Sequence, residues 1–283
     1  MRNILLLVVL GLTAGAGFAP APAAAQTSVN YTTVVNNRVP PVTYTVQGVY
    51  WQTMSEFVTS LPDNGGNLLT WNGPMYGLDF RVDTQQHWGL HLNGMTGNQS
   101  AWSFLGSSSG VSLSGTDTIW SVDVSYLWQQ PVPTNPGAIS TFRGFVGWGD
   151  AKASTTLGNL TSRGFAFNSA TLSADSSGVR VGFDFSHPFA SDWTLTAGVT
   201  YFPSTNTTGT IVSTSVGAAS YSTSGTGWDA FAGLRYTFSS RLDAEVGWRF
   251  VRQNMNAVSA AGTALCPCHT QWTGPYGAVG VSF

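Results

Sequence analysis

The strongest constraint on this chain is an alternation of apolar and polar residues that recurs in short runs as far as the last residue. The stretch "TIWSVDVSYLW" (118–128) places Trp, Val, Val, Tyr and Trp at every second position, with Ser and Asp among the residues between them. A β-strand points successive side chains to opposite faces. Each run therefore predicts a strand with one apolar face and one polar face.

Nine further runs follow the same rule, although the first is less regular and Phe145 interrupts another. Together with 118–128 they predict about ten strands, and bacterial outer-membrane barrels have even strand numbers. The nine runs are 43–54, 75–83, 87–93, 141–148, 178–186, 194–201, 227–239, 242–250 and 273–283.

The composition does not suit a water-exposed surface. Asp, Glu, Lys and Arg make up 8% of the 283 residues, against roughly a quarter in typical soluble proteins. The chain is also rich in aromatics, with 11 Trp, 9 Tyr and 16 Phe. The formal net charge of -2 provides no basic field for nucleic acid, so we expect no nucleic-acid partner.

Residues 1–25 have the features of a secretory signal peptide. Arg2 supplies the positive start, residues 4–12 form the apolar region, and Ala23, Ala24 and Ala25 fit a small-residue cleavage site. A membrane anchor fits less well, because the apolar run is short and is followed by small residues and prolines. We expect a periplasmic lead-in over 26–42 and one folded domain over 43–283.

Two features favour a membrane barrel over a soluble sandwich. The apolar faces end in aromatic residues, as in the girdles of barrels that cross lipid. The connections also alternate, because those near 84–86, 129–137, 187–192 and 239–241 are short, and those near 55–74, 94–117, 150–177, 202–225 and 252–273 are long. A sheet in hydrocarbon must close on itself to satisfy its backbone. We therefore predict an all-β fold, a transmembrane antiparallel up-and-down β-barrel of about ten strands.

The polar faces of these strands carry most of the charge. Ten strands lie close to the eight that side chains just fill, and buried charges need partners. We therefore favour a salt-bridged network inside the barrel, with a narrow polar passage and a catalytic cluster as alternatives. The predicted inward-facing set is Asp79, Arg81, Asp83, His91, Asp123, Arg143, Arg180, Asp184, Asp229, Arg235, Asp243, Glu245 and Arg249.

The histidines of "HWGLH" do not predict a metal site. His87 and His91 lie four apart, which would suit a helix, but on a strand they are separated by ~13 Å. Zinc bonds of ~2.0–2.1 Å exclude sharing one ion over that distance. We expect His87 in a turn and His91 in the lower or middle lumen.

The segment "CPCH" (266–269) also fails as a cofactor motif. A c-type haem needs two residues between the cysteines, and only Pro267 separates them. A Cys266–Cys268 disulfide, free or intermolecular thiols, and a metal site remain as alternatives, in that order. We predict no metal, no cofactor and no catalytic residue.

The signal peptide, the alternating strands and the terminal "VGVSF" resemble the Gram-negative outer-membrane β-barrel superfamily. The resemblance implies an outer-membrane location with both termini in the periplasm, and lipopolysaccharide and other membrane lipid as partners. It also implies that Val279, Val281 and Phe283 form the signal read by the barrel-assembly machinery. A more distant likeness, to the Legionella-type major outer-membrane protein family, rests on "YGLDFRVDTQQHWGLHL" and on "VDVSYLW" followed by "TFRGFVGW".

These features predict a porin-like or structural outer-membrane protein with at most a narrow polar passage for small solutes. The alternative is an adhesin or receptor that binds a host or surface ligand through Ser-, Thr- and Gly-rich loops such as 203–227. An outer-membrane protease or lipid-modifying enzyme is a third reading. Proteases of the omptin type share the strand number, but no His–Asp pair is apparent at the expected outer rim.

Overall fold

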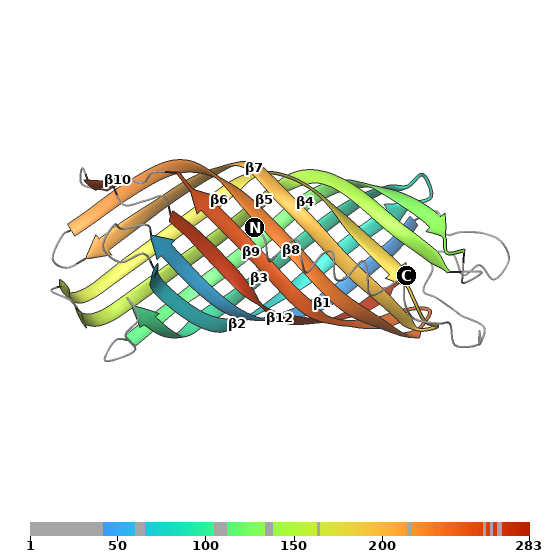
Figure 1. Cartoon of the computed structure of the whole chain (residues 1–283), viewed down its shortest axis with the longest axis horizontal. Coiled ribbons are helices and arrows are strands. Elements are labelled where there is room, and N and C mark those ends of the chain that lie inside the picture. The colour runs from blue at the N-terminus through green and yellow to red at the C-terminus, as the bar shows by residue number, and fades with distance from the viewer. Residues whose placement is uncertain are drawn as a thin grey trace.

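Ten long strands of the computed structural model close into one barrel, with neighbours in the order β1-β12-β9-β8-β7-β6-β5-β4-β3-β2 (Figure 1). The structure describes residues 42–59, 66–104, 112–133, 138–162, 165–213, 217–256, 259–260, 263–264 and 268–283. The barrel strands are β1 (Val42–Thr59), β2 (Gly66–Thr84), β3 (Trp88–Phe104), β4 (Ser112–Pro131), β5 (Ile139–Ser162), β6 (Phe165–Pro188), β7 (Trp193–Ser213), β8 (Gly217–Ser239), β9 (Leu242–Met255) and β12 (Cys268–Ser282).

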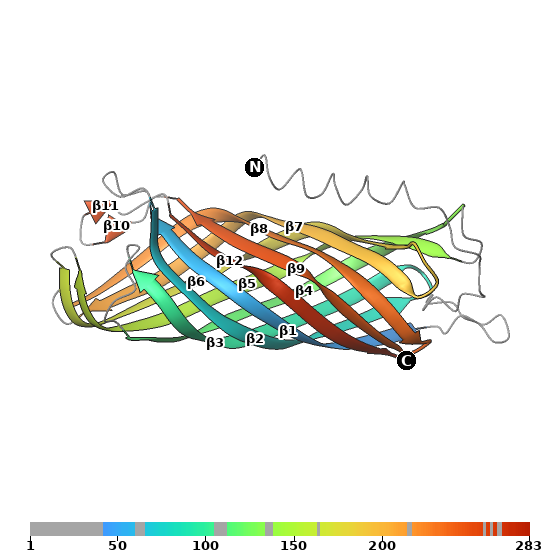
Figure 2. The same ribbon diagram turned by 60° about the horizontal axis from the view of Figure 1, so that its bottom comes forward.

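Every pair of neighbouring strands is antiparallel, and the pairing of β1 with β12 closes the circle. At that seam the Phe283 N–H donates to the Tyr44 carbonyl at 2.9 Å, and the Tyr44 N–H donates to the Phe283 carbonyl at 3.2 Å. β10 (Ser259–Ala260) and β11 (Thr263–Ala264) form a separate two-stranded sheet. The predicted fold class and strand number are therefore confirmed, and Figure 2 shows the seam strands side by side.

The predicted signal peptide (1–25) and lead-in (26–42) lie outside the described residues, apart from Val42, which begins β1. Among the residues that are described, no helix is long and apolar enough to cross a membrane.

Aromatic side chains form two belts on the outside of the barrel. The turn-side girdle lies near the short connections and packs ring against ring, as between Tyr126 and Trp128 at 4.8 Å. The far girdle lies further along the strands and includes the Tyr50–Tyr76 pair at 5.3 Å. The turn-side girdle consists of Trp88, Tyr126, Trp128, Phe142, Trp193, Tyr236 and Phe238, and the far girdle of Tyr50, Tyr76, Trp120, Trp148, Tyr201, Trp228 and Trp248.

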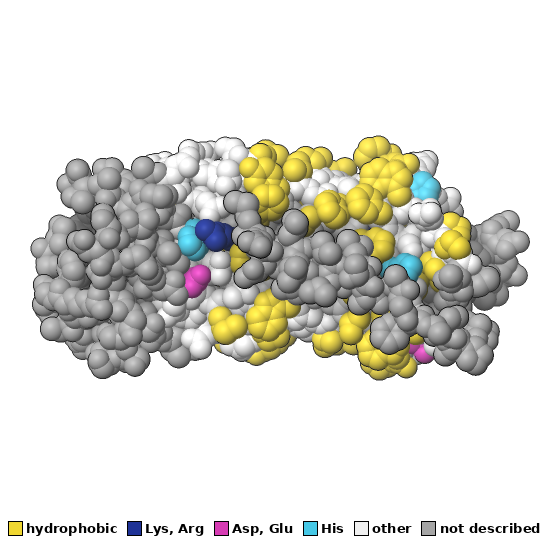
Figure 3. Space-filling view, in the orientation of Figure 1, with side chains coloured by type: hydrophobic (Ala, Val, Ile, Leu, Met, Phe, Trp, Pro, Cys, Tyr) yellow, Lys and Arg dark blue, Asp and Glu magenta, His cyan; other side chains and the backbone are white. Residues whose placement is uncertain are grey.

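The surface between the girdles is apolar and has the depth of a membrane core. Leu78, Val124, Val146 and Val246 are between 50% and 63% exposed there, and Figure 3 shows hydrophobic side chains over this part of one face. On β4, the step between Trp120 and Trp128 covers about 26 Å of strand. At a tilt of roughly 40° this is about 20 Å along the axis, close to the ~25 Å band of known outer-membrane barrels.

The strands are much longer than the alternating runs predicted. Most of the described residues in the five predicted long loops belong to strands, so the loop prediction was wrong for them. The stretch 203–227 consists mostly of paired strand, because β7 continues to Ser213 and β8 begins at Gly217. The reason is that both faces of these extensions are polar, so no alternation marks them. Their outward residues, such as Ser204, Asn206 and Thr208, are exposed, as expected of a sheet that has left the lipid.

Three of the four predicted short connections are confirmed; in the fourth, 129–137, residues 134–137 lie outside the described residues. Residues 85–87 join β2 to β3, 189–192 join β6 to β7, and 240–241 join β8 to β9. His87 lies in the first of these turns with a φ of 68°, a left-handed conformation that is uncommon for residues other than glycine. Both the last described residue and the start of β1 lie at this end of the barrel.

Inward-facing aromatic rings fill space that glycines leave on the neighbouring strands. Phe145, which interrupted the sequence pattern, points into the lumen and covers Gly182, where a Cβ would lie 2.6 Å from its ring. Phe231 covers Gly198 in the same way. Without a side chain on the glycines, the rings can lie flat against the wall, so the interior of this ten-stranded barrel is packed rather than open.

Candidate functional site

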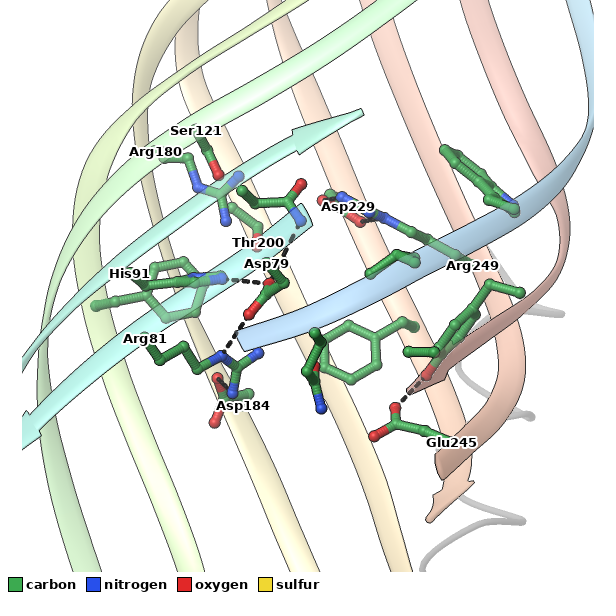
Figure 4. Close-up of a pocket in the computed structure, with 18 of the residues that line it drawn as sticks. Asp79, Arg81, His91, Ser121, Arg180, Asp184, Thr200, Asp229, Glu245 and Arg249 are labelled. Atoms are coloured by element: carbon green, nitrogen blue, oxygen red, sulfur yellow. Dashed lines mark hydrogen bonds and ion pairs between the residues drawn. The ribbon is translucent and has the colours of Figure 1, made fainter. Parts of the chain in front are cut away.

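The structure places all thirteen predicted residues, twelve charged side chains and His91, on the inner face of the barrel, in the half nearer the short turns. They come from β2, β3, β4, β5, β6, β8 and β9. We call this set the charge network, and Figure 4 shows its central part. Five guanidinium groups face seven carboxylates, so the network carries two net negative charges when His91 is neutral.

Eight members of the network form one continuous series of ion pairs across five strands. Its arginine links include Arg143 to Asp83 at 2.8 Å and Arg81 to Asp79 at 3.1 Å. Arginine is suited to such bridging because its planar guanidinium can contact two carboxylates at once. In order the series is Asp83, Arg143, Asp184, Arg81, Asp79, His91, Asp123 and Arg180.

His91 lies between two carboxylates within this series. Its Nε2 is 2.6 Å from Asp79 Oδ2, and its Nδ1 is 3.3 Å from Asp123 Oδ2. Asp123 is completely buried and also lies 3.0 Å from the Arg180 guanidinium. Because an acceptor faces each ring nitrogen, this position favours the doubly protonated imidazolium.

Two smaller groups complete the network. Arg249 contacts Asp229 through two nitrogens, at 2.8 and 3.2 Å, a bidentate geometry that strengthens an ion pair. Arg235 lies 2.7 Å from Glu245 and 3.8 Å from Asp243. Together with the series above, these pairs give all five lumenal arginines a carboxylate partner.

A small cavity lies among these groups. Its volume is about 90 Å³, enough for several waters. Arg81, Arg180 and Arg249 line it opposite four carboxylates, and neutral groups including Phe145, Phe231, Tyr276, Ser121 and Thr200 complete the wall. The cavity can hold water or a very small polar solute but offers no wide path.

An apolar cluster closes the lumen on the side of the network away from the short turns. Its side chains are at most 6% exposed. The barrel is therefore apolar on both the inner and the outer face at this level. Arg249 joins the two layers, because its Nη1 contacts the Met95 sulfur at 3.3 Å. We call this cluster the apolar plug: Trp51, Trp71, Met75, Met95, Ile119, Ala151, Ala153, Val251 and Trp272.

The sequence pattern missed this plug and one buried carboxylate beside it. Asp117 is 3% exposed and accepts hydrogen bonds from Trp71 Nε1 and Gln99 Nε2, both at 2.9 Å. Among the residues that the structure describes, no cation lies within ion-pairing distance of it. The sequence analysis had assigned Asp117 to a loop. For the plug, one signal was available: Tyr50 and Trp51 are adjacent large aromatics on a strand, so one of the two rings must face the lumen.

The remaining predicted residues divide between those described and those not. Val279 and Val281 on β12 and Phe283 directly after it face outward and are 57%, 36% and 65% exposed. Their role as an assembly signal stays a prediction. The alternatives for the cysteines are not resolved, since Cys266 lies outside the described residues. Within the described ranges, no group of three or more His, Cys, Asp or Glu side chains could hold a metal ion.

The comparisons with known proteins define the fold. No family model matches the sequence, and no curated protein matches it. The outer-membrane protease OmpT from Escherichia coli superposes with a TM-score of 0.60 at 11% identity, over 86% of this chain and 98% of that one. The translocator domain of the autotransporter NalP from Neisseria meningitidis has a TM-score of 0.47 at 13% identity, over 88% and 90%. The closed topology and the match to OmpT show that the chain has the fold of an outer-membrane β-barrel, and the Legionella-type likeness stays untested.

Proposed function

We propose that this protein is an integral outer-membrane barrel with a closed lumen, which serves a structural or surface-presenting role and does not act as a diffusion porin. The observation that carries the proposal is the filled interior. The apolar plug closes the lumen over nine side chains, and the cavity beside it has a volume of about 90 Å³. A space of that volume holds water and very small solutes only.

The outer-membrane placement is part of the proposal. It is supported by the two girdles, by the closed backbone hydrogen bonding and by the fold shared with OmpT. The start of β1 and Phe283 lie at the end with the short turns, and short turns are typical of the periplasmic side. The extended hairpins then project from the cell surface.

Conductance in planar bilayers tests the closed lumen. We expect the wild-type barrel to show no steps of the size that a general porin gives. The double variant Trp51→Ala/Trp272→Ala removes the two plug tryptophans that are least exposed and should introduce measurable steps. The matched control is Trp88→Ala/Trp128→Ala, since both of those rings face lipid. Large steps from the wild type would refute the proposal.

Surface binding is the second candidate, and it is supported by how far the strands extend past the far girdle. Beyond that girdle the outward faces of β7 and β8 carry exposed Ser, Thr and Asn. Shortening this hairpin across the pair Asn206 and Ser224 preserves the register of the membrane portion. Loss of cell or surface binding on shortening, with an unchanged barrel, would support an adhesin or receptor.

A catalytic role is less well supported. OmpT is a protease, but a likeness at 11% identity concerns the fold. The side chains of Asp79, His91 and Asp123 lie inside the lumen at 8%, 13% and 0% exposure, which leaves little surface for a peptide or lipid to contact. Hydrolysis of peptide or lipid by the folded, purified barrel would overturn this reading.

A further inference from the structure

Arg252 differs from the other arginines on the described strands. The five in the charge network each pair with a carboxylate inside the lumen. Arg252 faces outward from β9, because its neighbours Val251 and Gln253 are buried in the lumen at 2% exposure. No carboxylate among the described residues lies within ion-pairing distance of it. An arginine placed on the outside of a membrane barrel without an ion pair needs an explanation.

The hydrogen bonds of Arg252 orient a second donor beside it. Its Nε donates to Asn254 Oδ1 at 2.8 Å, and its Nη2 lies 3.3 Å from His269 Nδ1. A guanidinium can only donate, so His269 Nδ1 accepts. The proton of the neutral ring is then on Nε2, which is a donor. Two donor groups from adjacent strands, β9 and β12, therefore lie side by side on the outer surface.

The depth of the pair relative to the membrane is set by the far girdle. Arg252 is the register partner of Trp228, a member of that girdle that is 44% exposed. Girdle aromatics lie at the level of lipid headgroups, so the two donors lie at or just beyond the headgroups. Figure 3 shows a Lys or Arg side chain and a His side chain together, past the hydrophobic side chains on that face.

We propose that Arg252 and His269 bind the phosphate of a lipid headgroup, of the phosphorylated kind that lipopolysaccharide carries on its lipid A. Phosphate oxygens accept several hydrogen bonds at once, and guanidinium groups match that geometry. Basic residues beside a membrane attract anionic headgroups. This inference rests on the membrane placement proposed above.

One carboxylate on the same outer face opposes the anion. Glu56 on β1 is the register partner of Gln271, and Gln271 is the register partner of Arg252. Glu56 is therefore two strands away, too far to neutralise the guanidinium but close enough to weaken anion binding through space. Its removal should strengthen the interaction, which gives the proposal a test of opposite sign.

The experiment is a titration of the folded, full-length mature barrel in neutral detergent with diphosphoryl lipid A, read as bound lipid by native mass spectrometry. Dephosphorylated lipid A and inorganic phosphate are the parallel probes. Loss of a charge-assisted contact should weaken binding by about tenfold in Arg252→Gln, with a smaller loss in His269→Ala and a gain in Glu56→Gln. Lys152→Gln is the matched control, because Lys152 also faces outward but already pairs with Asp175 at 3.4 Å.

The outcomes separate the site from its alternatives. Equal losses in Arg252→Gln and Lys152→Gln, or equal binding of dephosphorylated lipid A, would overturn the site. If inorganic phosphate at matched concentration displaced lipid A, Arg252 and His269 would bind a free anion, and the proposal that they bind a lipid headgroup would be wrong. A heat-dependent gel shift verifies that each variant is folded. Membrane fractionation tests the proposed location separately, since binding in detergent does not depend on it.

Discussion

The guanidinium carbon of Arg249 lies 5.2 Å from the centroid of the Trp51 ring, and this contact joins the charge network to the apolar plug. Trp51 is completely buried, and its Nε1 donates to the Gly274 carbonyl at 3.1 Å. Trp51 therefore contributes packing, a hydrogen bond and a cation–π contact at the boundary between a polar layer and an apolar one.

Trp51→Ala should lower the free energy of unfolding substantially. Truncating a buried Trp costs about 3–5 kcal/mol, and the lost ring also removes the face on which Arg249 rests. Urea unfolding of the barrel in detergent, followed by the heat-dependent gel shift, measures the change. Trp88→Ala is the control, because Trp88 is 55% exposed on the lipid side and should cost clearly less. Equal costs would mean that the plug is loosely packed.

His91 should be essential to the charge network. His91→Gln leaves Asp79 and Asp123 buried on either side of a neutral amide, and breaking a buried ion pair on one side costs about 3–5 kcal/mol. Adding Asp79→Asn to this variant removes one of the stranded charges, so the double variant should lose less than the sum of the two single losses. Additive losses from the same unfolding measurement would contradict a coupled network.

The sequence predicted the wall of the barrel better than its contents. Strand number, short turns and the inward-facing charges follow from a period of two, which depends only on local geometry. The inward orientation of Trp51 and Phe145 was harder to predict, because a large apolar residue on the polar face breaks the alternation. Whether such a ring fills the lumen depends on glycines in neighbouring strands, such as Gly182 opposite Phe145, and that pairing requires the register.

The strand ends were unpredictable for a related reason. Beyond the far girdle, β7 and β8 have water on the outside and polar groups within, as at Thr205 and Thr207, which are completely buried. Alternation vanishes where both faces are polar, although the backbone pairing continues. Asp117 was missed for the same reason, since β4 begins at Ser112 but its alternating run was recognised only from residue 118 on.

Gly147 should not tolerate a methyl group. A Cβ there would overlap the backbone carbonyl oxygen of Val122 on the neighbouring strand, which cannot move without breaking the ladder. Gly147→Ala should therefore reduce the yield of folded barrel or lower its unfolding midpoint in urea. Gly48→Ala is the matched control, because a Cβ at Gly48 has no atom within 4 Å. A neutral Gly147→Ala would show that the β4–β5 pair can separate locally.

Phe283 should act in two distinct ways, and two assays can separate them. Its backbone exchanges two hydrogen bonds with Tyr44, while its ring is 65% exposed toward lipid. Phe283→Ser keeps the backbone pairing and removes the ring, whereas deletion of Phe283 removes both, and Phe283→Tyr preserves both.

For spontaneous folding into liposomes we expect wild type and Phe283→Tyr to be alike, Phe283→Ser to be slightly slower, and the deletion to be slowest. In cells, Phe283→Ser should fail nearly as severely as the deletion if the ring belongs to the predicted assembly signal. If Phe283→Ser were equally mild in both assays, the ring would only anchor the strand in lipid, and the predicted assembly signal would be wrong.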